Sequence, residues 1–225
     1  YLWPNIVEMV KVVGYSFKPF VRDGQFEISD EWEGLLDTMR TFNESGYVAD
    51  LGSWGNEWAA NWNEGKLLIR VMPSWDFFTD WDKNDGNIGI IKPFENAYEG
   101  GTFVSMYSGS ENKELADVFL NYLVSPEFQE VNLKEYNQIP ADKALTEKLA
   151  KDYSSEKFGG QNLLETYNQI NDGVYDIVLD KYTRPLQNMF QKHANEGIRN
   201  GLDNATILEN FKAEVRDSYP ELEMK

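Results

Sequence analysis

The sequence predicts an α/β protein that is rich in helices and has a few scattered strands. Apolar residues recur every three or four positions through most of the chain, which is the spacing of one face of an α-helix. Short apolar or alternating runs, bounded by glycine, proline or aspartate, interrupt these segments and are typical of strands. Helices and strands interspersed in this way favour the α/β class over an all-helical bundle.

The clearest helix of the first half begins at Ser29-Asp30. Asp30 and Glu33 have the spacing of a capping box, and Gly46 is placed to end the helix. The apolar residues of this segment share one face, which we expect to be buried. They are Trp32, Leu35, Leu36, Met39 and Phe42.

Two shorter helices are predicted on either side of it, over 5–13 and over 55–64. The second carries Trp58 and Trp62, four positions apart and therefore on one face. Helical spacing is mainly a sign of core packing, so we do not assign these two tryptophans to a binding site.

The second half contains two strong helix signals. Ser110 leads a helix with a predicted buried stripe, and Ser125-Pro126 starts another, with serine as N-cap and proline at the first helical position. The stripe consists of Leu115, Val118, Phe119, Tyr122 and Leu123. Further helices are expected over 141–152, 161–170, 184–199 and 205–217, the last capped by Asn204.

Five segments read as strands. The run 66–72 is apolar nearly throughout, which is typical of a strand in the middle of a sheet. The others are shorter and lie next to turn residues. They are 15–20, 25–28, 87–91 and 102–106.

Composition excludes several classes of function. A formal net charge of −17 argues against nucleic acid and anionic membrane surfaces as partners, since both are negatively charged. The chain has no cysteine, and its single histidine, His193, excludes a histidine-cluster zinc site. No apolar run approaches the roughly 18–20 residues that span a bilayer. We expect neither a metal nor another cofactor.

The turn after the 66–72 run carries the best candidate binding residues. Trp75 stands beside Asp76, and this pair suits a polyhydroxylated ring, because an indole covers the C–H face of a sugar while a carboxylate accepts bonds from its hydroxyls. The alternatives are a core tryptophan and an ordinary exposed carboxylate. Trp54 follows Gly52-Ser53 on a predicted loop, where an aromatic residue is harder to explain by burial.

Several short motifs, each weak alone, occur in one order along the chain. They are Trp-Pro at 3–4, Gly-Tyr-Ser-Phe at 14–17, Trp-Asn-Glu-Gly-Lys at 62–66, Pro-Ser-Trp at 73–75, Ser-Glu-Asn-Lys-Glu at 110–114, Ser-Pro-Glu-Phe-Gln at 125–129 and the segment 204–215. In this order and spacing they resemble the extracellular solute-binding proteins of carbohydrate ABC importers (maltose-binding-protein-like, family 1). The resemblance is collinear over essentially the whole chain.

The resemblance implies a periplasmic-binding-protein-like (type II) fold, in which two α/β lobes are hinged around a ligand. Residues 1–95 and 145–225 would form the helix-rich C-terminal lobe, and a strand–helix segment at 100–140 would belong to the N-terminal lobe. The rest of that lobe would lie outside this chain. Because the chain begins at Tyr1 without an initiator methionine, we expect a mature fragment or an excised domain.

The function that the resemblance implies is carbohydrate binding, of an oligosaccharide in our expectation, with delivery to the permease of an ABC importer. We expect a monomer without enzyme activity, located in the periplasm or on the surface of a Gram-positive bacterium as a lipoprotein. Trp75 matches the stacking tryptophan of the family, and Tyr1 matches a ligand-facing aromatic residue. Tyr182 and Arg184 lie near its C-terminal aromatic contact.

Two other functions remain open at this stage. A stand-alone lectin-like or interaction module would use the same aromatic residues. A glycosidase would need paired carboxylates, and the acidic residues from Asp76 to Asp85 could supply them, although 38 acidic residues make such pairs expected by chance. The run 80–86 resembles a calcium loop but has Lys92 where the bidentate glutamate should follow, so we reject it.

Overall fold

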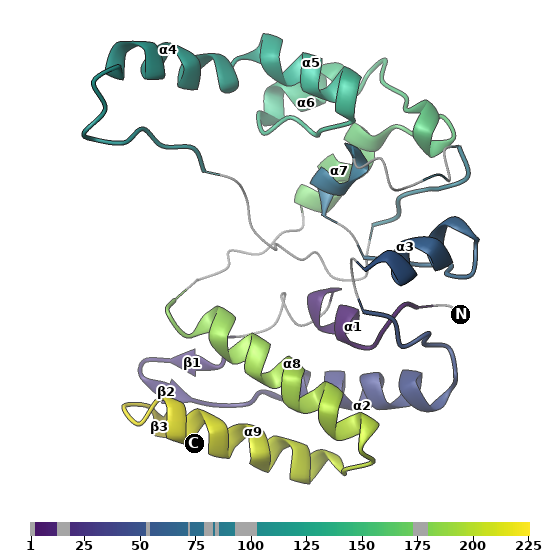
Figure 1. Ribbon diagram of the computed structural model, residues 1–225, viewed down its shortest axis with the longest axis vertical. Coiled ribbons are helices and arrows are strands. Elements are labelled where there is room, and N and C mark those ends of the chain that lie inside the picture. The colour runs from purple at the N-terminus through teal and green to yellow at the C-terminus, as the bar shows by residue number, and fades with distance from the viewer. Residues whose placement is uncertain are drawn as a thin grey trace. The chain divides into compact units, whose positions relative to one another are not determined.

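The computed structural model of the chain divides into two compact units (Figure 1). The first comprises Tyr1–Val71, Glu95–Tyr98 and Tyr175–Lys225, and the second comprises Met72–Phe94 and Glu99–Val174. The structure describes residues 3–12, 19–52, 55–71, 73–78, 83, 86–92, 103–172 and 180–225.

In the residues that the structure describes, the first unit joins five helices to a small sheet. Its helices are α1 (Val7–Val12), α2 (Asp30–Glu44), α3 (Asn56–Asn63), α8 (Thr183–Arg199) and α9 (Asn204–Ser218). Its strands are β1 (Val21–Arg22), β2 (Gln25–Phe26) and β3 (Glu223–Met224), in the order β1-β2-β3. Strand β2 pairs antiparallel with β1 and parallel with β3. The C-terminal strand therefore closes the unit against its N-terminal hairpin.

The hairpin turn between β1 and β2 follows from two residues. Asp23 and Gly24 both have positive φ angles, 53° and 80°, which is the backbone of a type I′ turn. Val21 then lies opposite Phe26 in the register of the pair. The Asp-Gly sequence thus determines the hairpin locally.

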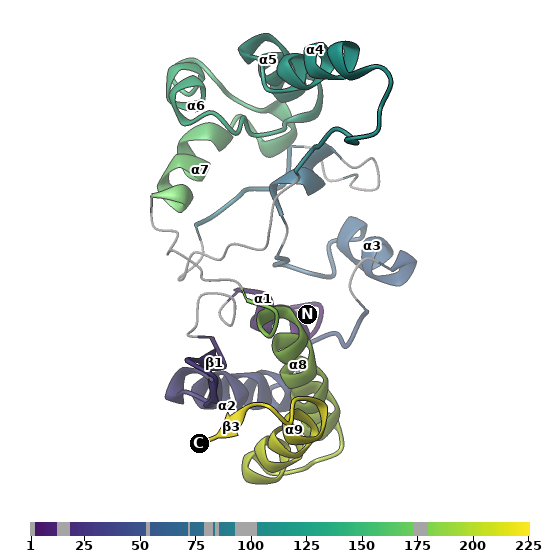
Figure 2. The same cartoon turned by 90° about the vertical axis from the view of Figure 1, so that its left-hand side faces the viewer.

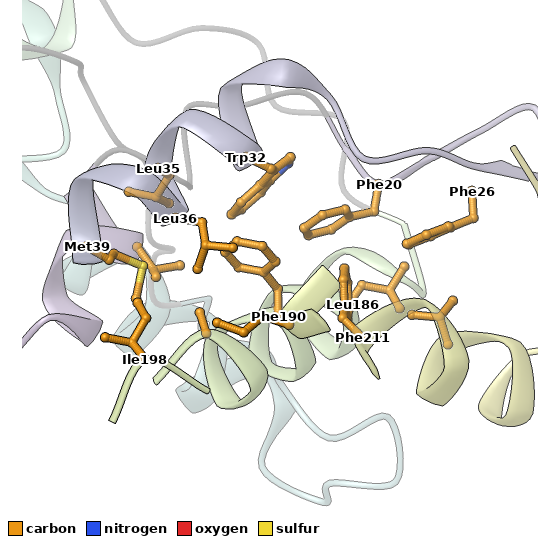
Figure 3. Packing of buried hydrophobic residues seen from close by; sticks show 14 of the residues in the cluster. Phe20, Phe26, Trp32, Leu35, Leu36, Met39, Leu186, Phe190, Ile198 and Phe211 are labelled. Carbon is orange, nitrogen blue, oxygen red and sulfur yellow. The ribbon is translucent and has the colours of Figure 1, made fainter. Parts of the chain in front are cut away.

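An aromatic cluster forms the core of the first unit (Figure 3). The rings of Phe20 and Trp32 stack with centroids 4.3 Å apart, and Phe190 meets Trp32 edge-on at 4.9 Å. Phe211 of α9 meets Phe20 at 5.2 Å. The predicted face of α2 lies in this core, with Trp32, Leu35, Leu36 and Met39 all buried and Phe42 packed against them. Three helices and the hairpin are thereby joined by one apolar cluster.

Helices α8 and α9 lie side by side and are linked by an ion-pair cluster (Figures 1 and 2). Lys192 Nζ donates to Glu214 Oε2 at 2.9 Å, and His193 Nε2 lies 2.5 Å from the same oxygen. The hydrogen bond from Lys192, with a smaller contribution from His193, holds the pKa of Glu214 below its ordinary value. The carboxylate is therefore more stable as an anion in the folded protein than in the unfolded chain.

Replacing Glu214 by glutamine should remove a pH-dependent part of the stability. Because the folded-state pKa is lowered, this contribution is present above the pKa of an unfolded glutamate and is lost as the pH falls through the folded-state value. The pair is partly exposed, so we expect a cost of at most about 1 kcal/mol. Urea denaturation from about pH 7 down to about pH 3 measures it. Asp217→Asn, at an exposed position of the same helix, is the control, and an equal effect of both variants at all pH values would contradict the assignment.

The second unit is built from short helices. They are the 3₁₀ helix η2 (Ser74–Phe78), α4 (Lys113–Leu123), α5 (Pro126–Tyr136), α6 (Lys143–Leu149), the 3₁₀ helix η3 (Glu156–Phe158) and α7 (Leu163–Asn171). Side-chain caps begin three of them, since Ser125, Asp142 and Asn162 accept from the backbone N–H groups of Phe128, Leu145 and Glu165. A small cluster of buried Phe158 and Leu163 holds η3 and α7 together.

Most of the predicted helices are confirmed, and two of the predicted caps are wrong. Ser29 is the N-cap of α2, and neither it nor a capping box supplies a side-chain bond there. Asn204 is the first residue of α9, and Asp203 caps that helix by accepting from Thr206 N at 2.7 Å. In both places the cap lies one residue earlier than predicted.

Three of the predicted strands are absent from the described residues. No strand forms over 66–71, 87–91 or 103–106, while the 25–28 strand is confirmed as β2. The backbone N–H of Val71 instead donates to the Glu8 carboxylate at 3.4 Å, and that of Lys66 donates to Asn61 O at 2.9 Å. The segment 66–71 is thus held by a side chain and a helix end. Most of the predicted 15–20 strand lies outside the described residues.

The predicted buried stripe of α4 is also wrong. Leu115, Val118, Phe119 and Tyr122 are all exposed, and Leu123 is half-buried. The helical period correctly places these residues on one face, but most of that face is exposed, and the Phe128 ring meets it only at Tyr122, with ring centroids 5.2 Å apart.

The two units divide the chain at points other than the predicted lobe boundaries. Residues 72–94 and 145–174 fall in the second unit, together with most of the 100–140 segment. The assignment of 1–95 and 145–225 to one lobe of a complete binding protein stays a prediction.

Candidate functional site

The turn at η2 presents Trp75 and buries Asp76. A backbone bond from Asp76 N to Pro73 O, 3.1 Å long, closes the turn. Successive residues of a 3₁₀ helix point about 120° apart, so neighbours can have opposite environments. The Trp75 side chain is 51% exposed, whereas Asp76 is fully buried. The indole is therefore available to a ligand, and the carboxylate is enclosed by protein.

Tyr167 of α7 belongs to the same electrostatic environment. Burial, and secondarily the negative charge of Asp76, raises the pKa of the Tyr167 phenol well above its ordinary value. The phenol therefore stays protonated and can donate a hydrogen bond. It packs against the Phe158 and Leu163 cluster. Tyr167 was not predicted as a site residue, because no local sequence pattern relates it to Asp76.

The Gln161 side chain connects the segment 86–92 to the η3–α7 region through hydrogen bonds. Its Oε1 accepts from Ile90 N at 2.7 Å, and its Nε2 donates to Ile90 O at 2.6 Å. A second link runs from Gly86 N to Lys157 O at 2.7 Å. The amide side chain thus makes the pair of bonds that a neighbouring strand would make. This explains why a strand-like sequence at 87–91 is held in place without a strand partner.

Trp58 and Trp62 are buried, and the prediction that they are core residues is confirmed. The guanidinium carbon of Arg70 lies 4.6 Å from the Trp62 ring centroid and 5.6 Å from that of Trp58. Such distances fit cation–π stacking. Arg70, the one charged residue within the apolar run 67–71, thus covers the two indoles of α3.

A buried carboxylate of the first unit was missed by sequence reasoning. Glu8 is almost fully buried and accepts from Val71 N, while its own N–H donates to Asn5 Oδ1 at 3.0 Å. Asn5 also donates to Leu51 O at 2.7 Å. These bonds tie α1 to the segments around residues 51 and 71, which gives Glu8 a positioning role.

Tyr182 and Arg184 lie at the start of α8, in the first unit. The Tyr182 hydroxyl donates to Glu221 Oε1 at 2.9 Å, and its ring meets that of Tyr219 edge-on at 5.4 Å. Asp180 Oδ1 accepts from the backbone of both Tyr182 and Thr183. Tyr182 therefore links the start of α8 to the C-terminal residues, and its contact with a ligand stays a prediction, as does that of the half-buried Arg184.

The predicted site residues are distributed over both units. Trp75 and Asp76 belong to the second unit, and Tyr182 and Arg184 to the first. Tyr1 and Trp54 lie outside the described residues.

Within the part of the chain that the structure describes, no three acidic or histidine side chains gather in a way that could hold a metal ion. The same residues contain no helix with the length and apolar character of a membrane span. A shallow pocket of about 370 Å³ lies between α8 and α9, lined by His193, Glu196, Asn200 and Asn210 among others.

Comparison with known proteins defines the family. Residues 6–157 match the family described as "Bacterial extracellular solute-binding protein". This chain belongs to that family. The match includes segments of both units of the solute-binding protein, and it confirms the family predicted from the motifs. None of the curated proteins compared matches the chain.

Two solved structures resemble this solute-binding protein. One, described as an extracellular solute-binding protein family 1, is 12% identical with a TM-score of 0.66, and the match covers 96% of this chain and 58% of the other. The second is the galacto-N-biose/lacto-N-biose I-binding protein of an ABC transporter from Bifidobacterium longum, in complex with lacto-N-biose. It is 15% identical with a TM-score of 0.69, and the match covers 100% of this chain and 61% of the other.

These likenesses concern the fold, and they confirm the predicted periplasmic-binding-protein-like α/β class. The chain spans about three fifths of the length of both neighbours.

Proposed function

We propose that this protein binds a carbohydrate outside the cell and delivers it to the permease of an ABC importer. The observation that carries the proposal is the half-exposed indole of Trp75, on a turn immediately before a buried carboxylate. Large aromatic side chains are mostly buried in a folded protein, and the exposed part of an indole can cover the C–H face of a sugar ring. Membership of the solute-binding family and the sugar complex of a structural neighbour support it.

The roles within the site follow from burial. Trp75 supplies the stacking surface. Asp76 is buried, so it accepts a bond from a ligand hydroxyl that reaches into the turn, with the protonated Tyr167 as an additional donor. Tyr1, Trp54, Tyr182 and Arg184 complete the proposed contacts. The sugar is an oligosaccharide in this proposal, because a stacking platform is most useful to a ligand with several rings.

The remaining parts of the proposal come from the family. The protein acts as a monomer without enzyme activity, in the periplasm or as a lipoprotein on a Gram-positive surface. Residues of this chain form most of the C-terminal lobe, and the ligand is enclosed when a second lobe closes over it.

Alanine at position 75 should abolish most of the sugar affinity. Burying a large apolar side chain against a ligand contributes about 1.5–3 kcal/mol, so the dissociation constant should rise by roughly ten- to a hundredfold. A thermal-shift screen of the protein as expressed from its gene, against lacto-N-biose and a panel of mono- and oligosaccharides, measures the effect, because a bound ligand raises the melting temperature.

Tyr47→Ala is the matched control, since Tyr47 is 56% exposed and thus comparable with Trp75, but lies in the first unit far from η2 in the sequence. It should leave the ligand-dependent shift unchanged. A Trp75→Ala variant that keeps the full shift would show that the indole is not the stacking surface.

A further inference from the structure

The pocket between α8 and α9 has an apolar side formed where the two helices meet. Figures 1 and 2 show these helices side by side. They touch at Gly197, where an added Cβ would lie only 2.4 Å from Ile207 Cγ1. Leu202, Ile207 and Ala213 line the pocket next to this contact. Its volume of about 370 Å³ falls within the range of about 300–1,000 Å³ that small-molecule sites occupy.

The polar side of the pocket offers hydrogen-bond acceptors. Glu196 contributes a carboxylate, and Asn200 and Asn210 contribute carboxamides. Within the described part of the chain, these three exposed side chains make no hydrogen bond or ion pair of their own. The fourth polar residue of the lining, His193, is already engaged, since its Nε2 lies 2.5 Å from Glu214 Oε2. Three side chains are therefore available to a ligand.

The charge at the pocket is negative and is not compensated by a nearby cation. Glu196 lies in the last turn of α8, where the helix macrodipole already places partial negative charge. Lys192, one turn earlier, donates to both carboxylate oxygens of Glu214, at 3.1 and 2.9 Å. Arg199 pairs with Asp50. Among the described residues, neither a lysine nor an arginine lines the pocket.

We propose that this pocket binds a small organic cation, namely a primary ammonium group on a short aliphatic chain. An ammonium group has three N–H donors and no acceptor, which matches one carboxylate and two carboxamide oxygens. Leu202 and Ile207 would cover the aliphatic chain. A neutral ligand would leave the Glu196 charge uncompensated, and the net charge of −17 repels an anion. The site lies wholly in the first unit, and the inference does not depend on sugar binding.

The single histidine makes the site observable. His193 lines the pocket and gives the only imidazole signal of the chain in an NMR spectrum. The chain is titrated with pentylamine at constant pH and ionic strength, and separately with 1-pentanol, which has the same aliphatic chain without the charge. Pentylamine should shift the His193 signal along a saturating curve with a dissociation constant of about 1 mM or tighter. Binding of 1-pentanol should be at least about tenfold weaker, because it lacks the charge-assisted bonds.

Glu196→Gln tests the role of the carboxylate. It should weaken pentylamine binding at least about tenfold, because the charge-assisted bond to the ammonium group is lost. Glu209→Gln is the matched control, since Glu209 is an exposed carboxylate of α9 outside the lining, and its removal should change the affinity by no more than about twofold. Urea denaturation should show that Glu196→Gln is no less stable than the wild type, because an acidic group in the last turn of a helix is unfavourable.

Three results would overturn the proposal. Equal affinities for pentylamine and 1-pentanol would indicate an apolar groove without a cation site. Equal losses of affinity in Glu196→Gln and Glu209→Gln would indicate a general attraction of cations to an acidic protein. A His193 signal that does not move when pentylamine is added to the folded chain would show that the pocket stays empty.

Discussion

Replacing Phe190 by alanine should lower the free energy of unfolding of the first unit by about 3–5 kcal/mol. Phe190 is fully buried in α8, and its ring lies 4.9 Å from that of Trp32 and 5.6 Å from that of Phe211. Its removal would leave a cavity among rings that belong to three helices, and these backbones cannot all move inward together. Since whole domains are stable by about 5–15 kcal/mol, the loss is a large fraction of the total.

The matched control is Phe119→Ala, which removes the same side chain from another helix. Phe119 is 55% exposed, so its truncation should change the stability by no more than about 0.5 kcal/mol. Urea denaturation measures both variants, and hydrogen exchange of the α8 and α9 amides assigns the transition to the first unit. If Phe119→Ala proved as destabilising as Phe190→Ala, the Phe119 side chain would be buried in solution.

Helix positions could be predicted because their signals are local. Ser125 and Pro126 specify the start of α5 by themselves, since the serine accepts the N–H of Phe128 and the proline needs no donor there. The Asp23-Gly24 turn is equally local. These features depend on a few adjacent residues, so no distant contact can overturn them.

Strands and burial could not be predicted in the same way, because both depend on partners elsewhere in the chain. The run 66–71 has a strand-like composition, but Glu8 and Asn61 hold its backbone. The period of α4 shows which residues share a face and does not show what covers that face. The helical period predicted that Phe119 is buried, and only the structure shows that it is exposed.

The candidate site shows the same limit. Trp75 could be selected from the sequence because its neighbours form a family motif, and its exposure is consistent with a binding role. The burial of Asp76 could not be foreseen, since adjacent residues on a short turn face different surroundings. Tyr167 was missed because its relation to Asp76 connects positions 91 residues apart in the sequence, with no local pattern.

Substituting leucine for Gln161 should destabilise the second unit by about 2–4 kcal/mol, because two half-buried backbone groups of Ile90 would lose their partners. Leucine is similar in size, so the effect reports hydrogen bonding more than packing. The amide also donates to Thr166 Oγ1 at 3.1 Å, which fixes its orientation and assigns Oε1 to the Ile90 N–H. The segment 86–92 would then be released from η3 and α7, and hydrogen exchange at the Ile90 amide should accelerate.

Two further variants separate the amide geometry from the general effect of a leucine on a helix. Gln169→Leu, at an exposed position of α7, should leave both the stability and the Ile90 exchange rate nearly unchanged. Gln161→Glu keeps an acceptor for Ile90 N but places a second oxygen against Ile90 O, so it should be destabilising as well and recover partly at acid pH, where the protonated carboxyl can donate. If Gln161→Leu left the Ile90 exchange rate unchanged, other contacts would be sufficient to hold the segment. The two hydrogen bonds from the Gln161 amide to Ile90 would then not be needed.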